Sequence, residues 1–305
     1  MRAGAILGPV TAGVLLTALY TMLISSADGI TKMFAATYAA PQLFALSGGV
    51  VAALSVLANR RGGGSRGMRT TCPGAMAIRV LATVAGTVAF FYAFRLLPFA
   101  EVFLFIAMIP LFAALMSGPF LGEAVRPQVW VALALGAVGV MCLFPHGISS
   151  VGFGHLVALA AVVLGTVSMV ASRYIGRRDD NLLAQVFYPN LALMVVMGAA
   201  LPFVFTPMAL ADIGWALAYA VLLFGARWVL VAALKMLPAY VVTPLMNLQF
   251  LWMVGIGMVV FGEVPGGMVF CGAAIIICAG AWLVYDQAIA ATKPAPVKPR
   301  IMPAE

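Results

Sequence analysis

The pattern of residues 97–123, LPFAEVFLFIAMIPLFAALMSGPFLGE, returns 140 positions later in residues 237–263, LPAYVVTPLMNLQFLWMVGIGMVVFGE. In each copy a Leu-Pro pair and a Gly-Glu pair bracket an apolar run of more than 20 residues. About 20 helical residues cross a hydrocarbon core that is about 30 Å thick. Each run therefore predicts one membrane span, and the constant offset predicts an internal duplication.

The residue types at the two ends of each run are those that are favoured at helix ends. Pro is tolerated in the first turn of a helix, where its missing N–H has no intrahelical acceptor, and Gly is favoured just after the last turn. A Glu beyond that Gly lies near the positive N-terminal end of the next helix. Glu123 and Glu263 are therefore interpreted first as features of helix ends.

The composition defines the class of protein. Hydrophobic residues make up 64% of the chain and charged residues 9%, and the mean hydropathy is +1.11. Soluble domains carry about 25% charged residues, so this composition predicts a polytopic protein in a lipid bilayer. The net charge of +8 does not indicate a nucleic-acid partner, because the basic residues cluster in short loops rather than on one face. Only Cys72 lies in a loop, so free thiols are expected.

Ten apolar segments follow one another, which predicts an all-α integral membrane protein of two five-helix repeats. The first repeat is expected over 1–145, the second over 152–288, and a disordered cytoplasmic tail over 289–305. Pro110 is expected to kink the fourth span, and Gly136 and Gly139 suit close packing of the fifth. The predicted spans are Gly8–Ala36, Gln42–Ala58, Ala75–Phe94, Phe99–Leu121, Gln128–Leu143, Gly154–Tyr174, Leu182–Phe205, Ile213–Ala233, Tyr240–Phe261 and Met268–Tyr285.

The basic residues of the loops predict the orientation. If the N-terminus is cytoplasmic, the outer loops hold only Arg95, and both termini are cytoplasmic. An odd number of helices per repeat then inverts the second copy relative to the first. A signal peptide is the alternative for the first span, but its removal would leave the first repeat one helix short. The inner loops hold Arg2, Arg60, Arg61, Arg66, Arg69, Arg126, Arg177, Arg178, Lys235, Lys293, Lys298 and Arg300.

Polar residues inside the spans are the candidates for function, because a charge at a helix centre costs roughly 2.5–3.5 kcal/mol. Thr21, Ser25, Asp28 and Lys32 share one face of the first span, which should face protein or water. Asp28 and Lys32 lie one turn apart. They either neutralise each other or line a cavity that binds or relays charge.

Arg227 lies near the middle of the eighth span. One interpretation is an ion pair with a buried carboxylate, Asp28 or Glu101, or a side chain that reaches to the interface. The other is contact with an anionic group of a substrate, because the guanidinium presents a planar fork of donors that suits a carboxylate. Glu101 lies close to a helix end, where an interfacial position is the simpler interpretation.

Amides and aromatic residues form a third group of candidates. Asn247 and Gln249 follow Pro244, and Tyr188 and Asn190 flank Pro189. A buried amide serves either an interhelical hydrogen bond or a site. Trp252 either packs or stacks on a ligand.

The paired units, each followed by one more apolar span, resemble the EamA-type repeat of the drug/metabolite transporter superfamily over nearly the whole chain. Members of that family usually carry an Arg inside the second helix, where Ser47-Gly48-Gly49 stands here. In that family the fifth and tenth helices are peripheral, and the other helices line the cavity. The resemblance therefore implies a substrate site that includes Asp28, Lys32, Tyr188, Asn190, Arg227, Asn247 and Gln249.

The expected function is a secondary transporter that moves a small polar metabolite, amino-acid-like or an organic anion, across a bacterial inner membrane. Alternating access is the expected mechanism and export the expected direction. No catalytic residue, cofactor or metal is expected, and no Walker A sequence is present. Asp28 or Glu101 could carry a coupling proton, but an exchanger or facilitator fits equally well, and an oligomer is compatible with the sequence. A receptor, a scaffold or an intramembrane enzyme is the alternative.

Overall fold

The computed structural model describes residues 3–61, 68–122, 127–142, 151–179, 181–236 and 245–292. All regular elements in these ranges are helices. The predicted boundaries agree with the observed ones within a few residues for most spans. The helices are α1 Ala3–Thr37, α2 Ala40–Arg61, α3 Pro73–Leu96, α4 Phe99–Ile106, α5 Ile109–Leu121, α6 Pro127–Met141, α7 Phe153–Gly176, α8 Leu182–Val204, α9 Leu210–Met236, α11 Gln249–Phe261 and α12 Gly267–Thr292.

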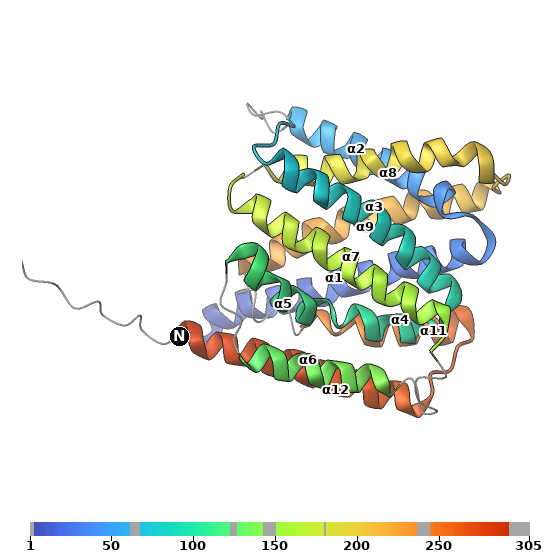
Figure 1. Ribbon diagram of the computed structural model, residues 1–305. Helices are drawn as coiled ribbons and strands as arrows, with labels where there is room; N and C mark the ends of the chain where they lie inside the picture. The colour runs from blue at the N-terminus through green and yellow to red at the C-terminus, as the bar shows by residue number, and fades with distance from the viewer. Residues whose placement is uncertain are drawn as a thin grey trace, which may run out of the picture.

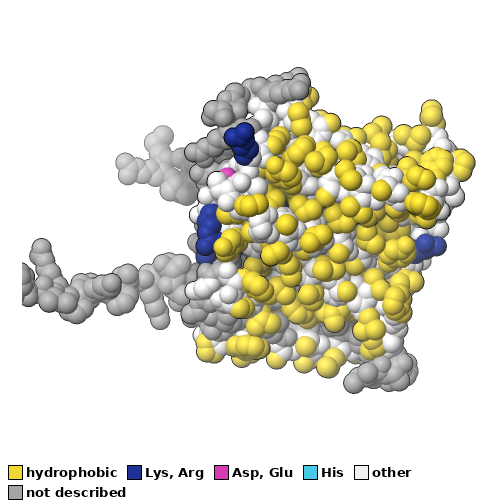
Figure 2. All heavy atoms as spheres, turned by 45° about the horizontal axis from the view of Figure 1, so that its top comes forward, with side chains coloured by type: hydrophobic (Ala, Val, Ile, Leu, Met, Phe, Trp, Pro, Cys, Tyr) yellow, Lys and Arg dark blue, Asp and Glu magenta, His cyan; other side chains and the backbone are white. Residues whose placement is uncertain are grey.

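The outside of this bundle is apolar. Six of the described helices, α1, α2, α3, α7, α8 and α9, are long and apolar enough to cross a membrane, and shorter apolar helices accompany them. Large apolar side chains such as Leu81 and Val259 are 70% and 86% exposed. Figure 2 shows a continuous hydrophobic face with basic groups only toward its two edges. A surface of this kind is stable only against lipid, so the chain is a multi-pass membrane protein.

The helices lie side by side in Figure 1, and the start of α1 and the end of α12 lie on the same side of the molecule. Helices of the first half pair in a reciprocal way with helices of the second half: α1 packs on α9 and α3 on α7, while α2 packs on α8, α4 on α11 and α6 on α12, and α5 also packs on α7. Each helix in the first half therefore has its main partner in the second half.

The fourth predicted span is two helices rather than one kinked helix. A tight turn at Ala107 and Met108 separates α4 from α5, and Pro110 is the second residue of α5. Pro cannot donate to the carbonyl four residues earlier, so it is tolerated at the start of a new helix. The helix therefore breaks just before Pro110 instead of bending there.

The same break recurs in the second copy of the pattern. Asn247 and Leu248 form a turn before α11, at positions offset by 140 from Ala107 and Met108. The backbone N–H of Leu248 donates to the carbonyl of Leu245, as the N–H of Met108 does to that of Phe105, both at 3.0 Å. The two copies of the sequence pattern thus have the same kind of tight turn, with an i to i−3 bond, at equivalent positions. Residues 240–244 of the ninth predicted span lie outside the described residues.

The expected close packing at the fifth span is confirmed. A Cβ atom on Gly139 would lie 2.9 Å from the carbonyl oxygen of Gly272 on α12, and one on Gly272 would meet the carbonyl of Gly139. A Cβ atom on Gly136 would lie 2.5 Å from Leu111. Small residues allow helix backbones to approach closely, and here they hold α6 against α12 and α5.

A similar approach explains the Ser-Gly-Gly segment in α2. A Cβ atom on Gly48 would lie 2.7 Å from the carbonyl oxygen of Asn190 and 3.0 Å from the backbone nitrogen of Met194, both on α8. Backbone atoms cannot move aside as a side-chain tip can. The α2–α8 contact therefore leaves no space for a side chain at this position.

Candidate functional site

Arg227 lies on the side of α9 that faces protein. Ala220, two helical turns earlier on the same side, is 0% exposed, and so is Ala216. The Arg227 side chain is nevertheless exposed. It interacts electrostatically with Tyr219 and with Tyr20 on α1. In the described part of the chain it has neither an ion-pair partner nor a hydrogen-bond partner.

The polar stripe of α1 faces protein, as the sequence predicts. The Nε2 of Gln249 on α11 donates to the Oδ2 of Asp28 at 3.0 Å. Nearby, the indole N–H of Trp252 donates to the Oγ1 of Thr21 at 3.1 Å. The hydroxyl of Ser25 lies 3.5 Å from the carbonyl oxygen of Gln249. Asp28 and Gln249, two of the predicted site residues, are thus brought together across the α1–α11 contact.

Lys32 belongs to a second polar group, at the end of α1. Its Nζ lies 2.6 Å from the Oε1 of Glu263 and donates to the carbonyl of Leu97 at 2.9 Å. The other oxygen of Glu263 accepts from the N–H of Phe99 at 2.7 Å. Lys32 is therefore neutralised by Glu263 rather than by Asp28. Glu263 supports the start of α4, so it stabilises a helix end in the other half of the molecule.

The remaining predicted site residues are Asn190, Tyr188 and Asn247. On α8 the amide of Asn190, which is 6% exposed, donates to the carbonyl of Val186 at 2.7 Å within its own helix. Tyr188 packs against a buried cluster that includes Met76. Asn247 lies in the turn before α11 and is half-buried. Their contact with a substrate stays a prediction.

Glu101 has a partner other than Arg227. Its Oε2 lies 3.7 Å from the Nε2 of His155 at the start of α7. In this structure neither Glu101 nor Asp28 therefore forms the ion pair that was one interpretation of Arg227. No described carboxylate lies within ion-pair distance of Arg227.

Arg79 on α3 is a polar residue that the sequence reasoning missed. Pro189 in α8 has no N–H, so the carbonyl of Gln185, four residues earlier, lacks its helical donor. Arg79 donates to that carbonyl from both Nε and Nη2 at 3.3 Å, and its Nη1 donates to the carbonyl of Ser168 at 3.2 Å. The sequence did contain a signal for this contact. Arg79 is a charged residue inside an apolar span, and the span on the opposite helix contains Pro189.

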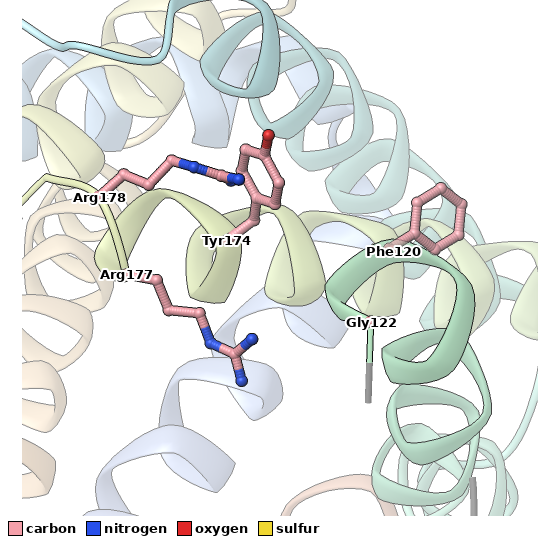
Figure 3. A pocket seen from close by; sticks show the side chains of 5 residues that line it. All are labelled: Phe120, Gly122, Tyr174, Arg177 and Arg178. Atoms are coloured by element: carbon pink, nitrogen blue, oxygen red, sulfur yellow. The ribbon is translucent and has the colours of Figure 1, made fainter. Parts of the chain in front are cut away.

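A separate basic pocket lies where α5 and α7 end. It has a volume of about 450 Å³ and is lined by Phe120, Gly122, Tyr174, Arg177 and Arg178 (Figure 3). The guanidinium of Arg178 lies 3.7 Å from the centre of the Tyr174 ring. None of the predicted site residues lines this pocket.

The described part of the molecule is thus an apolar helical bundle with charged and amide side chains in its interior. Intramembrane ionisable groups that face the bundle interior are typical of proteins that conduct or bind polar solutes.

No protein-family model matches the chain. The chain is 27% identical to the riboflavin transporter of Rhizobium johnstonii over 233 residues, which cover 76% of this chain and 77% of that protein. It is 25% identical to the S-adenosylmethionine uptake transporter of Rickettsia bellii over 236 residues, 75% of this chain and 79% of that protein. A solved crystal structure that is 23% identical matches 92% of this chain and 99% of its own with a TM-score of 0.60, which shows a shared fold.

Proposed function

We propose that this protein is a secondary transporter that moves a small polar metabolite, amino-acid-like or an organic anion, across the inner membrane of a bacterium. The observation that carries the proposal is Arg227, a charged side chain that is exposed on the protein-facing side of α9. A permanent charge without a protein partner is expensive inside a membrane protein unless water or a ligand solvates it. The likeness to two proteins named as transporters supports the same conclusion.

The helix arrangement supports an alternating-access mechanism. The reciprocal pairs of helices and the repeated turns fit two five-helix repeats in inverted orientation, an architecture whose binding site lies between the halves. The contacts of Lys32 with Glu263 and Leu97 join α1 to the ends of α3 and α11, on the side that the loop charges predict to be outer. These contacts close that end in the present conformation, and they must break when the site opens outward.

The EamA-type resemblance is the basis for expecting export. One of the two relatives is named as an uptake transporter, so an assay needs to measure both directions. The substrate site is proposed to include Arg227, Asp28 and Gln249, with Lys32, Asn247, Tyr188 and Asn190 as further candidates.

Flux in proteoliposomes tests the proposal. Riboflavin and S-adenosylmethionine are the first probes, followed by a panel of amino acids and organic acids, with protein-free liposomes as the control. A carrier shows saturable flux that depends on the protein and falls in Arg227→Gln. Saturable binding of a probe without flux would instead favour a receptor.

A further inference from the structure

We propose that the basic pocket at the ends of α5 and α7 binds the phosphate group of an anionic phospholipid. The pocket has a volume of about 450 Å³, and Arg177 and Arg178 both line it (Figure 3). It is separate from the candidate substrate site, because none of the residues proposed for that site lines it. The proposal therefore does not depend on which molecule the protein transports.

The first step is the arrangement of the Arg178 side chain. Tyr174 lies in the last turn of α7, and the guanidinium of Arg178, four residues later, lies over its ring at 3.7 Å from the centre. A cation held over an aromatic face keeps its N–H donors for another partner. In the described part of the chain, the Arg178 guanidinium makes neither a hydrogen bond nor an ion pair. The ring thus positions a charged group whose donors are available to a ligand.

The second step is the charge at this end of α7. Arg177 adds a second guanidinium to the same pocket. Residues 173–180 contain three arginines and two aspartates, so this segment carries a net positive charge. Asp179, which follows Arg178, accepts the backbone N–H groups of Thr71 and Asn181. Guanidinium groups bind phosphate oxygens through two parallel N–H bonds, so a phosphate is the anion that suits this pocket best.

The third step is the apolar wall of the pocket. Phe120, near the end of α5, lines the pocket and is 63% exposed. Aromatic side chains at the ends of membrane helices lie at the level of the lipid headgroups. A phospholipid has a phosphate for the two arginines and an acyl chain for Phe120, whereas a soluble phosphate compound would leave Phe120 without a partner. The loop charges predict that this side is cytoplasmic, and basic pockets between helices on that side suit anionic headgroups.

The test measures the thermal unfolding midpoint of the purified full-length protein in a non-ionic detergent as lipid is added. Phosphatidylglycerol is the anionic probe, and phosphatidylcholine with the same acyl chains is the zwitterionic control. A ligand that binds only the folded state raises the midpoint as its concentration rises. We expect a saturable rise with phosphatidylglycerol and none with phosphatidylcholine. Sodium phosphate that replaces chloride at constant ionic strength should give no rise, because it has no acyl chain.

Variants of the pocket assign the rise to this site. Arg178→Gln removes the charge and the fork of donors, so the apparent affinity for phosphatidylglycerol should fall at least about fivefold. Tyr174→Leu keeps both guanidinium groups but removes the ring under Arg178, so the affinity should also fall, whereas Tyr174→Phe keeps the ring and should preserve it. Arg95→Gln is the matched control, because Arg95 is an exposed arginine in the last turn of α3 on the predicted outer side.

Native mass spectrometry of the same variants gives a second readout that does not depend on stability. The Arg178→Gln protein should retain fewer phosphatidylglycerol molecules than the Arg95→Gln protein. An equal rise with phosphatidylcholine, or a rise and a lipid count that Arg178→Gln and Tyr174→Leu leave unchanged, would overturn the proposal. A rise with sodium phosphate alone, lost in Arg178→Gln, would also overturn it and would indicate a soluble phosphate compound as the ligand.

Discussion

At the scale of a single residue, variants of Arg227 distinguish a substrate-binding site from an internal ion pair. Because no described carboxylate pairs with it, Arg227→Gln should insert and fold normally, and Arg227→Lys likewise. Loss of a charge-assisted bond to a ligand is worth about 1.5–3 kcal/mol, or roughly 10- to 100-fold in affinity. Both variants should therefore lose transport of an anionic or zwitterionic substrate, measured as flux at fixed protein density.

The double variant Arg227→Gln with Asp28→Asn is the control for that prediction. If the two residues only neutralised each other, Arg227→Gln would destabilise the protein, and the second change would restore stability and flux. Recovery of normal flux in the double variant would contradict substrate contact by Arg227. In the structure Asp28 already has Gln249 as a partner, so we expect no recovery.

Asp179 gives a prediction about pH. The N–H of Thr71 donates to its Oδ2 at 2.8 Å and the N–H of Asn181 to its Oδ1 at 3.0 Å, which lowers the pKa of the carboxyl below its ordinary value. The stability that it contributes is complete above the ordinary pKa of about 3.9 and is lost as the pH falls through the lower folded value. Thermal unfolding of wild type and Asp179→Asn should differ at pH 7 and converge in acid. A difference that grows in acid would contradict this.

At the scale of helices, the contact between α2 and α8 predicts a strict size limit at Gly48. A methyl group there meets the backbone of Asn190 and Met194, so Gly48→Ala should lower the free energy of unfolding by about 1–3 kcal/mol. Gly74 in the first turn of α3 has no neighbouring atom within 4 Å and is the matched control. Gly74→Ala should be neutral or stabilising by up to about 1 kcal/mol, as read from thermal or denaturant unfolding. Equal effects of the two changes would refute this account.

The positions of the helices were largely predictable because an apolar run of about 20 residues has the length of a membrane-spanning helix. The break between α4 and α5 was not, since the turn at Ala107 and Met108 involves ordinary apolar residues, and only Pro110 signals it. The contact partners of the polar side chains were less predictable than the positions of the helices. Lys32 joins Glu263, and Arg79 joins a carbonyl on α8, and both contacts depend on tertiary packing that local periodicity does not contain.

The orientation of the whole molecule can be tested at Cys72, which is the N-cap residue of α3 and is partly exposed. The loop charges predict that this end is cytoplasmic. A membrane-impermeant thiol reagent should therefore spare Cys72 in intact cells and label it in inverted vesicles, with Cys72→Ser as the control. Labelling in intact cells would reverse the assignment.

Arg227 is a charged side chain exposed on the protein-facing side of α9. If an anionic substrate supplies the charge that balances Arg227, the loaded carrier is closer to electroneutral than the empty one. Moving one elementary charge through the full potential is worth about 2.3 kcal/mol per 100 mV. The membrane voltage would then act mainly on the return of the empty carrier, so a clamped potential should change the turnover rate more than the apparent affinity.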